Sequence, residues 1–133
     1  MDNQASTDAR RRFRVLCADD EVSVSGWVAA TLRHHGVQCD TAVDGHHALY
    51  KLAVDEEGYD LLITDARMPH LDGWGLILRA RASGFRGPVI VHSGSLDDSE
   101  RHRYEALEVD RILDKPASAS ALMRVIKHAQ YAA

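Results

Sequence analysis

Four short apolar segments of the sequence are closely followed by polar residues that could do chemistry together. The set contains three carboxylates, one hydroxyl and one amine. Carboxylates brought close together repel one another, and some would protonate unless a cation joined them. A hydroxyl donor and an ammonium charge could stabilise a phosphoryl group in transfer, which depends mostly on positioning and charge neutralisation. In chain order the residues are Asp19 and Asp20 after 15–18, Asp65 after 61–64, Ser93 after 89–92, and Lys115 after 111–113.

These residue types indicate an aspartyl nucleophile served by a divalent metal ion. An Asp carboxylate can attack phosphorus and give an acyl phosphate. Hard oxygen ligands in an open, partly hydrated site suit Mg²⁺, which prefers one or two carboxylates and keeps several waters. Taken alone, each residue has a plain structural explanation, such as a solvated acidic turn for Asp19-Asp20-Glu21. Only the joint pattern favours a site, and it requires the segments to meet.

The segments between these residues alternate between strand and helix patterns. Short apolar runs bounded by charge are typical of buried parallel strands, and three- and four-residue apolar spacing predicts helices. Gly36 is expected to close the first helix in a left-handed conformation, and Met68-Pro69 predicts a turn. Helix N-caps are predicted at Asp72, at Asp97 or Asp98, and at Ser118. The expected strands are 15–18, 37–42, 61–64, 89–92 and 111–113.

Strands that alternate with helices predict the fold class. Right-handed crossovers give a parallel sheet with helices on both faces, an α/β flavodoxin-like doubly wound fold. The strand order expected for five such strands is 2-1-3-4-5. Ligands of open sheets bind at the carboxyl ends of the strands, near the switch point between the first and third strands. The polar residues named above all fall at that edge.

Composition indicates one ordinary globular domain in 133 residues, with 45% hydrophobic and 27% charged residues. We expect a flexible tail at 1–12 and the domain at 13–133. A net charge of −4 gives no reason to expect nucleic-acid binding, and no apolar run suggests a membrane span. The first twelve residues lack an apolar signal core, so a cytoplasmic location is expected. Cys17 and Cys39 are predicted to be buried, reduced thiols.

From about Arg14 to Gln130, the chain resembles the response-regulator receiver family. The most specific stretch is 60–73, DLLITDARMPHLDG, which looks like the family's phosphoacceptor strand, Met-Pro turn and Asp-Gly helix start. The acidic pair after the first strand, Ser93 after the fourth, and Lys115-Pro116 after the fifth complete the resemblance. It implies a phosphorelay domain that accepts a phosphoryl group on Asp65 from a phosphohistidine of a sensor histidine kinase or a histidine phosphotransfer protein.

The resemblance also implies roles for the other site residues. Mg²⁺ (or Mn²⁺) would be bound by Asp20, Asp65 and the backbone carbonyl of Arg67, and Asp19 would act through metal-bound water. Lys115 would pair with the acceptor carboxylate and then with a phosphoryl oxygen. Ser93 would hydrogen-bond the phosphoryl group and act as a switch residue. Such a domain is not a conventional enzyme, because the phosphoryl group is taken up and slowly lost by its own acceptor.

Three positions depart from the family pattern. Ile112 stands at the switch position where an aromatic ring is usual, so the aromatic switch cannot operate in its usual form. Glu108-Val109 replaces a frequent Gly-Ala, and Ala117 replaces a frequent Phe. All lie on the face formed by the helix after Asp97, the strand 111–113 and the helix after Ser118. Homodimerisation through this face, which family members use, is the predicted assembly. Arg67 and Ser95 flank the site at positions expected to tune the lifetime of the phosphoryl group.

Three other functions were weighed. A flavin-binding domain of the same architecture needs a hydroxyl- and glycine-rich phosphate loop after the first strand, where Asp19-Asp20-Glu21 would repel phosphate. A phosphatase with Asp65 as nucleophile commonly needs a second acidic residue two positions on, where this chain has Arg67. A receiver-like module that binds partners without phosphorylation is the remaining alternative, and the intact set of polar residues argues against it.

Overall fold

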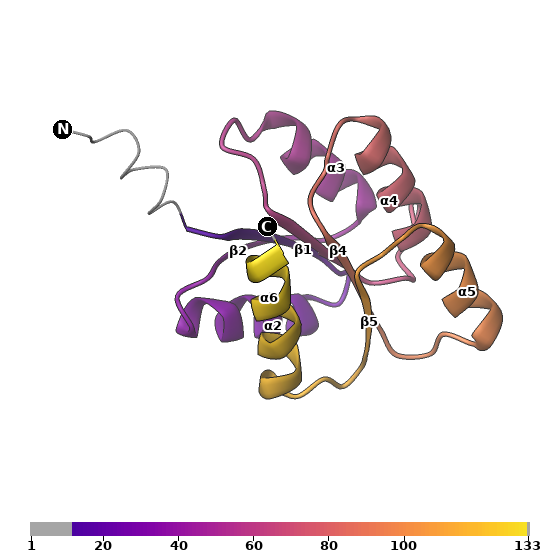
Figure 1. Ribbon diagram of the computed structural model, residues 1–133. Coiled ribbons are helices and arrows are strands. Elements are labelled where there is room, and N and C mark those ends of the chain that lie inside the picture. The colour runs from indigo at the N-terminus through magenta and orange to yellow at the C-terminus, as the bar shows by residue number, and fades with distance from the viewer. Residues whose placement is uncertain (1–11, 133) are drawn as a thin grey trace.

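The computed structural model describes residues 12–132, which form five strands and five helices in alternation (Figure 1). The predicted tail at 1–12 lies outside the described residues, apart from Arg12. Within the described part, no helix combines the length and apolar character needed to cross a membrane. The elements are β1 (Arg14–Ala18), α2 (Val22–His34), β2 (Gln38–Ala42), α3 (Gly45–Val54), β3 (Leu61–Thr64), α4 (Gly73–Ala82), β4 (Val89–Ser93), α5 (Asp98–Ala106), β5 (Arg111–Asp114) and α6 (Ala119–Ala132).

The strands form one parallel sheet in the order β2-β1-β3-β4-β5, which confirms the predicted fold class and topology. The central strands are wholly buried, as their continuous apolar runs predicted. In the register, Ala18 pairs with both Ala42 and Thr64, and Ser93 pairs with Asp114. The carboxyl ends of all five strands therefore reach one edge of the sheet.

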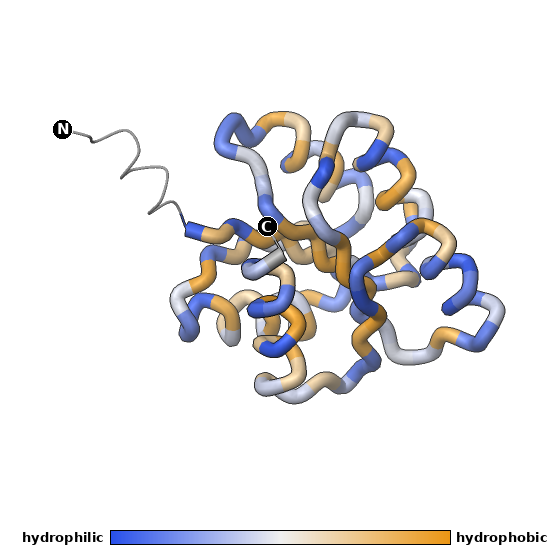
Figure 2. Tube along the Cα trace, viewed as in Figure 1, coloured by the Kyte–Doolittle hydropathy of each residue, from blue (hydrophilic) through white to orange (hydrophobic). Residues whose placement is uncertain are grey.

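Each face of the sheet carries its own apolar core (Figure 2). Alternate strand residues such as Val15, Cys17 and Ile63 pack with α2 and α6 on one face. Their neighbours, such as Leu16 and Leu62, pack with α3, α4 and α5 on the other. Cys17 and Cys39 are free, buried thiols, as predicted. Trp27, on α2, is 38% exposed.

Helix ends lie where the capping residues predicted them. The carboxylates of Asp72 and Asp97 accept hydrogen bonds from Gly75 N and Glu100 N, and Asp97 with Glu100 completes a capping box. Ser118 Oγ accepts from Ala121 N at the start of α6. Glu108 closes α5 at a φ of +58°, a left-handed conformation that favours glycine. A glycine would adopt this φ without steric cost, so the replacement of Gly by Glu108 affects the backbone directly.

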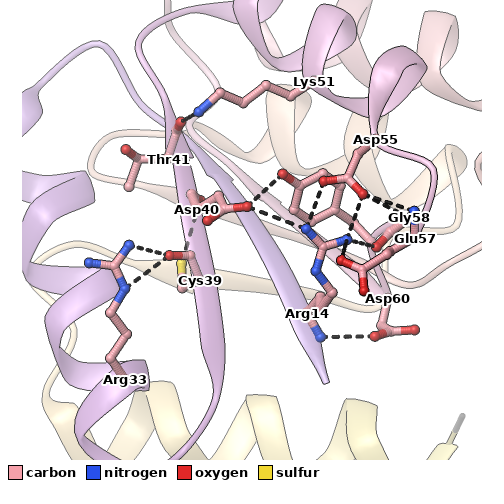
Figure 3. A network of polar contacts seen from close by, with 11 residues as sticks. Arg14, Arg33, Cys39, Asp40, Thr41, Lys51, Asp55, Glu57, Gly58 and Asp60 are labelled. Atoms are coloured by element: carbon pink, nitrogen blue, oxygen red, sulfur yellow. Dashed lines mark hydrogen bonds and ion pairs between the residues drawn. The ribbon is translucent and has the colours of Figure 1, made fainter. Parts of the chain in front are cut away.

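At the amino end of the sheet, Arg14 gathers the surrounding carboxylates and one aromatic ring (Figure 3). Its guanidinium donates to Asp55 Oδ1 at 2.8 Å and Oδ2 at 2.7 Å, and it lies 4.5 Å from the ring centroid of Tyr59. The Tyr59 hydroxyl donates to Asp40 Oδ2 at 2.7 Å. The network joins β1, β2 and the segment before β3 through one buried cation. Hydrogen bonding to Arg14 holds the pKa of Asp55 down at about 2.

We predict that this network makes the free energy of unfolding depend on pH in acid solution. A carboxylate with a folded-state pKa of about 2 and an unfolded value of about 4 contributes stability above pH 4 and loses it as the pH falls toward 2. Asp55→Asn should lower the free energy of unfolding by about 1 kcal/mol at pH 7 and should lose less between pH 4 and pH 2 than the wild type. Urea unfolding across this pH range measures both effects. Glu56→Gln, an exposed neighbour, is the control, and parallel profiles for Asp55→Asn and wild type would contradict the prediction.

Candidate functional site

One ammonium group joins the carboxylates at the carboxyl edge of the sheet. Lys115 Nζ donates to Asp19 Oδ2 at 2.9 Å and to Asp65 Oδ2 at 3.3 Å, and it lies 3.6 Å from Glu21 Oε1. Asp19 and Asp65 are 1% and 6% exposed. The residues come from β1, β3 and β5, as much as 96 positions apart in the sequence. The predicted convergence of Asp19, Asp65 and Lys115 is therefore present in the fold.

The carboxylates of the site repel one another, and the single ammonium of Lys115 only partly offsets that repulsion. Burial raises the pKa of Asp19, and hydrogen bonds from Lys115 and from Glu21 N only partly oppose that effect. Burial would lower the pKa of Lys115, but Asp19 and Asp65 outweigh it and hold the pKa above its ordinary value. Lys115 is thus fixed as a cation. One positive charge faces three carboxylates, which leaves net negative charge suited to a divalent cation.

The loop after β3 positions Asp65 through its backbone. Asp65 N donates to Ala18 O at 2.9 Å, which continues the β1–β3 ladder past the end of the strand. Ala66 N donates to Asp65 Oδ1 at 2.7 Å and fixes one carboxylate oxygen. Gly73 at the start of α4 lies so close that an added Cβ would be 2.3 Å from Asp65 O. Only glycine allows α4 to begin against the acceptor loop in this way.

Three carboxylates form a group that could hold a metal ion. Ligand oxygens of Asp19, Glu21 and Asp65 lie within 4.8 Å of one another. Glu21 was not assigned a role from the sequence, and it approaches because its own N–H donates to Asp19 Oδ1 at 2.9 Å. The side chain of Asp20 is exposed and lines an adjacent hollow together with Arg67. This set of hard oxygen ligands fits Mg²⁺.

Ser93 and Ile112 lie on the neighbouring strands β4 and β5, of which β4 pairs with the strand that precedes Asp65. Thr64 pairs with Val91, so buried Ser93 is one position beyond the level of Asp65. Among the described contacts, its hydroxyl has no hydrogen bond to Asp65. Ile112 pairs with Val91 and packs, half-buried, on the face of the sheet covered by α3, α4 and α5. His92 is buried, and burial lowers its pKa.

The side chain of Arg67 crosses from the loop after β3 to the start of α5. Its guanidinium donates to both carboxylate oxygens of Glu100, at 2.8 and 2.9 Å, and to Ser95 O at 2.7 Å. Glu100 is also the third residue of α5 and forms the capping box with Asp97. The predicted neighbours Arg67 and Ser95 are therefore in contact. The contact closes one side of a hollow of about 420 Å³ beside the acceptor.

Sequence reasoning missed three residues of this region: Glu21, Glu100 and Tyr104. Glu21 and Glu100 carried a local signal, because one is part of the acidic run and the other stands three residues after the Asp97 cap. Tyr104 was recognised only as an apolar residue of its helix. In the fold its hydroxyl lies 3.5 Å from Ala66 O, beside the acceptor.

Comparison with known proteins agrees with this geometry. A sequence profile of the "Response regulator receiver domain" matches residues 15–127. The chain belongs to this family. Receiver domains are signalling modules of two-component systems, and they interact with sensor histidine kinases or phosphotransfer proteins. The match covers the acidic residues after β1, the loop after β3 with Asp65, Ser93 and Lys115.

Relatives of this receiver include segments of much longer proteins. It is 30% identical over 121 residues to the sensor histidine kinase RcsC of Salmonella typhi, covering 91% of this chain and 13% of that protein. It is 31% identical over 116 residues to the transcriptional regulatory protein PcoR of Escherichia coli, covering 86% of this chain and 50% of that protein. The chain thus spans half or less of these relatives.

Solved receiver structures have the same fold. A response regulator receiver protein from Pseudomonas putida superposes with a TM-score of 0.84 at 28% identity, covering 89% of this chain and 98% of that one. The chemotaxis protein CheY4 of Vibrio cholerae superposes with a TM-score of 0.83 at 24% identity, covering 90% and 99%, and supports the fold alone.

We predict that Lys115 is essential to the stability of this edge. Lys115→Met leaves Asp19 and Asp65 buried beside each other without a cation, so the free energy of unfolding should fall by about 3 kcal/mol. The double variant Asp19→Asn/Lys115→Met should recover most of that loss, because one of the two buried charges is removed. Urea unfolding at pH 7 with a chelator measures both, with Lys127→Met on the exposed side of α6 as the control. No recovery in the double variant would contradict this account.

Proposed function

We propose that this receiver accepts a phosphoryl group on Asp65 from a phosphohistidine and thereby changes its partner interactions in a phosphorelay. The observation that carries the proposal is the contact of Lys115 Nζ with both Asp19 and Asp65, made by residues from three strand ends. Membership of the receiver family supports the same function. The alternative is a receiver-like module that binds partners without phosphorylation.

The chemistry required of the chain is small. An Asp65 carboxylate oxygen forms the new P–O bond while the P–N bond to the donor imidazole breaks, and the imidazole nitrogen keeps the bonding pair. Lys115 then offers its ammonium to a phosphoryl oxygen, and Ser93 offers a hydroxyl from the adjacent strand. Ala66 N already donates to Asp65 Oδ1, so the attacking carboxylate is oriented before the donor arrives.

Mg²⁺ (or Mn²⁺) fits this site because net negative charge remains after Lys115 is counted. We propose that Asp20, Asp65 and the backbone carbonyl of Arg67 hold the ion, with Asp19 acting through water. The ion supplies positive charge against the phosphoryl oxygens. Asp20 is exposed and lines the hollow beside Arg67, whose carbonyl is the third proposed ligand, whereas Glu21 does not line that hollow. The hydrogen bond from Ala66 N to Asp65 Oδ1 orients the acceptor carboxylate.

We propose a sensor histidine kinase or a histidine phosphotransfer protein as the donor, with the domain acting in the cytoplasm. The names of the relatives support this pairing, since one is a sensor histidine kinase and another a transcriptional regulator. The acceptor would also lose its phosphoryl group slowly, without turnover of an external substrate. Homodimerisation through α5, β5 and α6 stays a prediction. An ion pair between Arg101 and Asp114 already spans α5 and β5 on that face.

Phosphoryl uptake tests the central proposal directly. Incubation with Mg²⁺ and acetyl phosphate should add one phosphoryl group, because the small donor needs only the acceptor site. Intact-mass measurement should show the adduct in the wild type and in the surface control Asp98→Asn. Asp65→Asn should show none. No adduct in the wild type under any metal or donor condition would leave the phosphorylation-independent module as the better function.

A second measurement separates the metal ligands. Asp20→Asn should weaken Mg²⁺ binding by about tenfold or more, because a direct carboxylate ligand is lost. Glu21→Gln should change it by less than about threefold, because Glu21 does not line the hollow shared by Asp20 and Arg67 and acts on the ion only through a solvent-exposed charge. Isothermal titration with Mg²⁺ gives both affinities. Equal weakening in the two variants would place Glu21 in the metal site and contradict the proposed ligand set.

A further inference from the structure

Helix α5 is held to the rest of the molecule by very few apolar contacts. All nine of its residues are described, and Tyr104 is the only one with a buried side chain. In Figure 2 the helix is mostly blue and white, in contrast to the orange strands beside it. A helix anchored by so little apolar surface opens or shifts at low free-energy cost. Its position must therefore depend on what Tyr104 contacts.

The polar end of Tyr104 reaches the loop that carries the acceptor. Its ring is 5% exposed within the core under α3, α4 and α5, and its hydroxyl lies 3.5 Å from Ala66 O. The same carbonyl accepts from Gly73 N, at the start of α4, at 3.0 Å. One side chain thus joins α5, the residue after Asp65 and the first turn of α4. A distance of 3.5 Å marks a weak bond that a small shift can make or break.

The surroundings give the ring room to respond. The hollow of about 420 Å³ lies against Tyr104 and is bordered by Arg67, Trp74 and Arg103. Arg103 lies over the ring of Trp74, 4.9 Å from its centroid, on the outer side of the hollow. The bond from Arg67 to Glu100 forms a second, solvent-exposed connection between the acceptor loop and α5. A phenol at the border of this space can shift without displacing the core.

We propose that Tyr104 couples the occupancy of Asp65 to the position of α5; the inference rests on the proposed function. Ala66 N donates to Asp65 Oδ1, so a phosphoryl group on the carboxylate acts on the peptide whose neighbouring carbonyl meets the phenol. A shift of the Ala66 carbonyl changes its hydrogen bond with Tyr104, the one buried side chain of α5. The side chain of Ile112 has no polar atom and cannot make such a contact. Because coupling is reciprocal, a partner bound to α5 alters the acceptor loop through the same residue.

The first arm of the test uses the unmodified protein. Tyr104→Phe keeps the ring and removes only the hydroxyl, so the α5 amides should exchange hydrogen about two- to fivefold faster, as expected for one weak hydrogen bond. Tyr50→Phe, an exposed tyrosine on α3, is the matched control and should leave α5 unchanged. Hydrogen-exchange mass spectrometry of a peptide covering 98–106 reads the effect. Unchanged exchange in Tyr104→Phe would overturn the coupling.

The second arm loads the same proteins with acetyl phosphate and Mg²⁺, with uptake verified by intact mass. Loading should alter the exchange of the 98–106 peptide in the wild type and in Tyr50→Phe, and at least half of that change should vanish in Tyr104→Phe at equal uptake. An equal change in all three proteins would overturn the proposal. Absence of uptake in the wild type would contradict the proposed function instead, and the first arm would still decide whether Tyr104 anchors α5.

Discussion

The carboxyl edge of this sheet depends on one ammonium group that holds buried carboxylates of like charge together. Lys115 touches Asp19 and Asp65 at hydrogen-bond distance, and burial opposes the ionised form of Asp19. Such a group is stable only if three strand ends meet within a few ångströms. The parallel register of β1, β3, β4 and β5 meets that condition, because it brings every strand end to the same edge. The net negative charge that remains suits this edge to a divalent cation, which would offset the charge of an incoming phosphoryl group.

Strand β1 is fixed by charge at both of its ends. At the amino end, Arg14 pairs with Asp55 and lies over Tyr59. At the carboxyl end, Asp19 pairs with Lys115. The residues between are apolar and buried, so they specify the faces of the sheet but not the position of the strand along its axis. The two charged ends supply that positional information, and they keep Asp19 level with the acceptor.

Much of the fold and of the site could be predicted from local sequence signals. Apolar runs located the strands, Asp72 and Asp97 located helix starts, and the strand ends located Asp19, Asp65 and Lys115. The contacts of Glu21 and Tyr104 could not be predicted, because each depends on a side-chain direction that only the assembled loops determine. Glu108 is the opposite case, because the sequence already marked this position as a departure from glycine. The structure shows a left-handed backbone at that residue.

The site and α5 differ in how tightly they are held, and this difference is itself informative. Asp65 is fixed by backbone hydrogen bonds, by Lys115 and by the close approach of Gly73. In contrast, α5 has one buried side chain and two ion pairs at the surface, Arg67–Glu100 and Arg101–Asp114, and such pairs contribute little to stability. A phosphoryl group can alter a distant surface only through an element whose alternative positions differ little in free energy. Among the helices that cover this face, α5 is the one we propose for this role, because its one buried side chain ends at the carbonyl of the residue after Asp65.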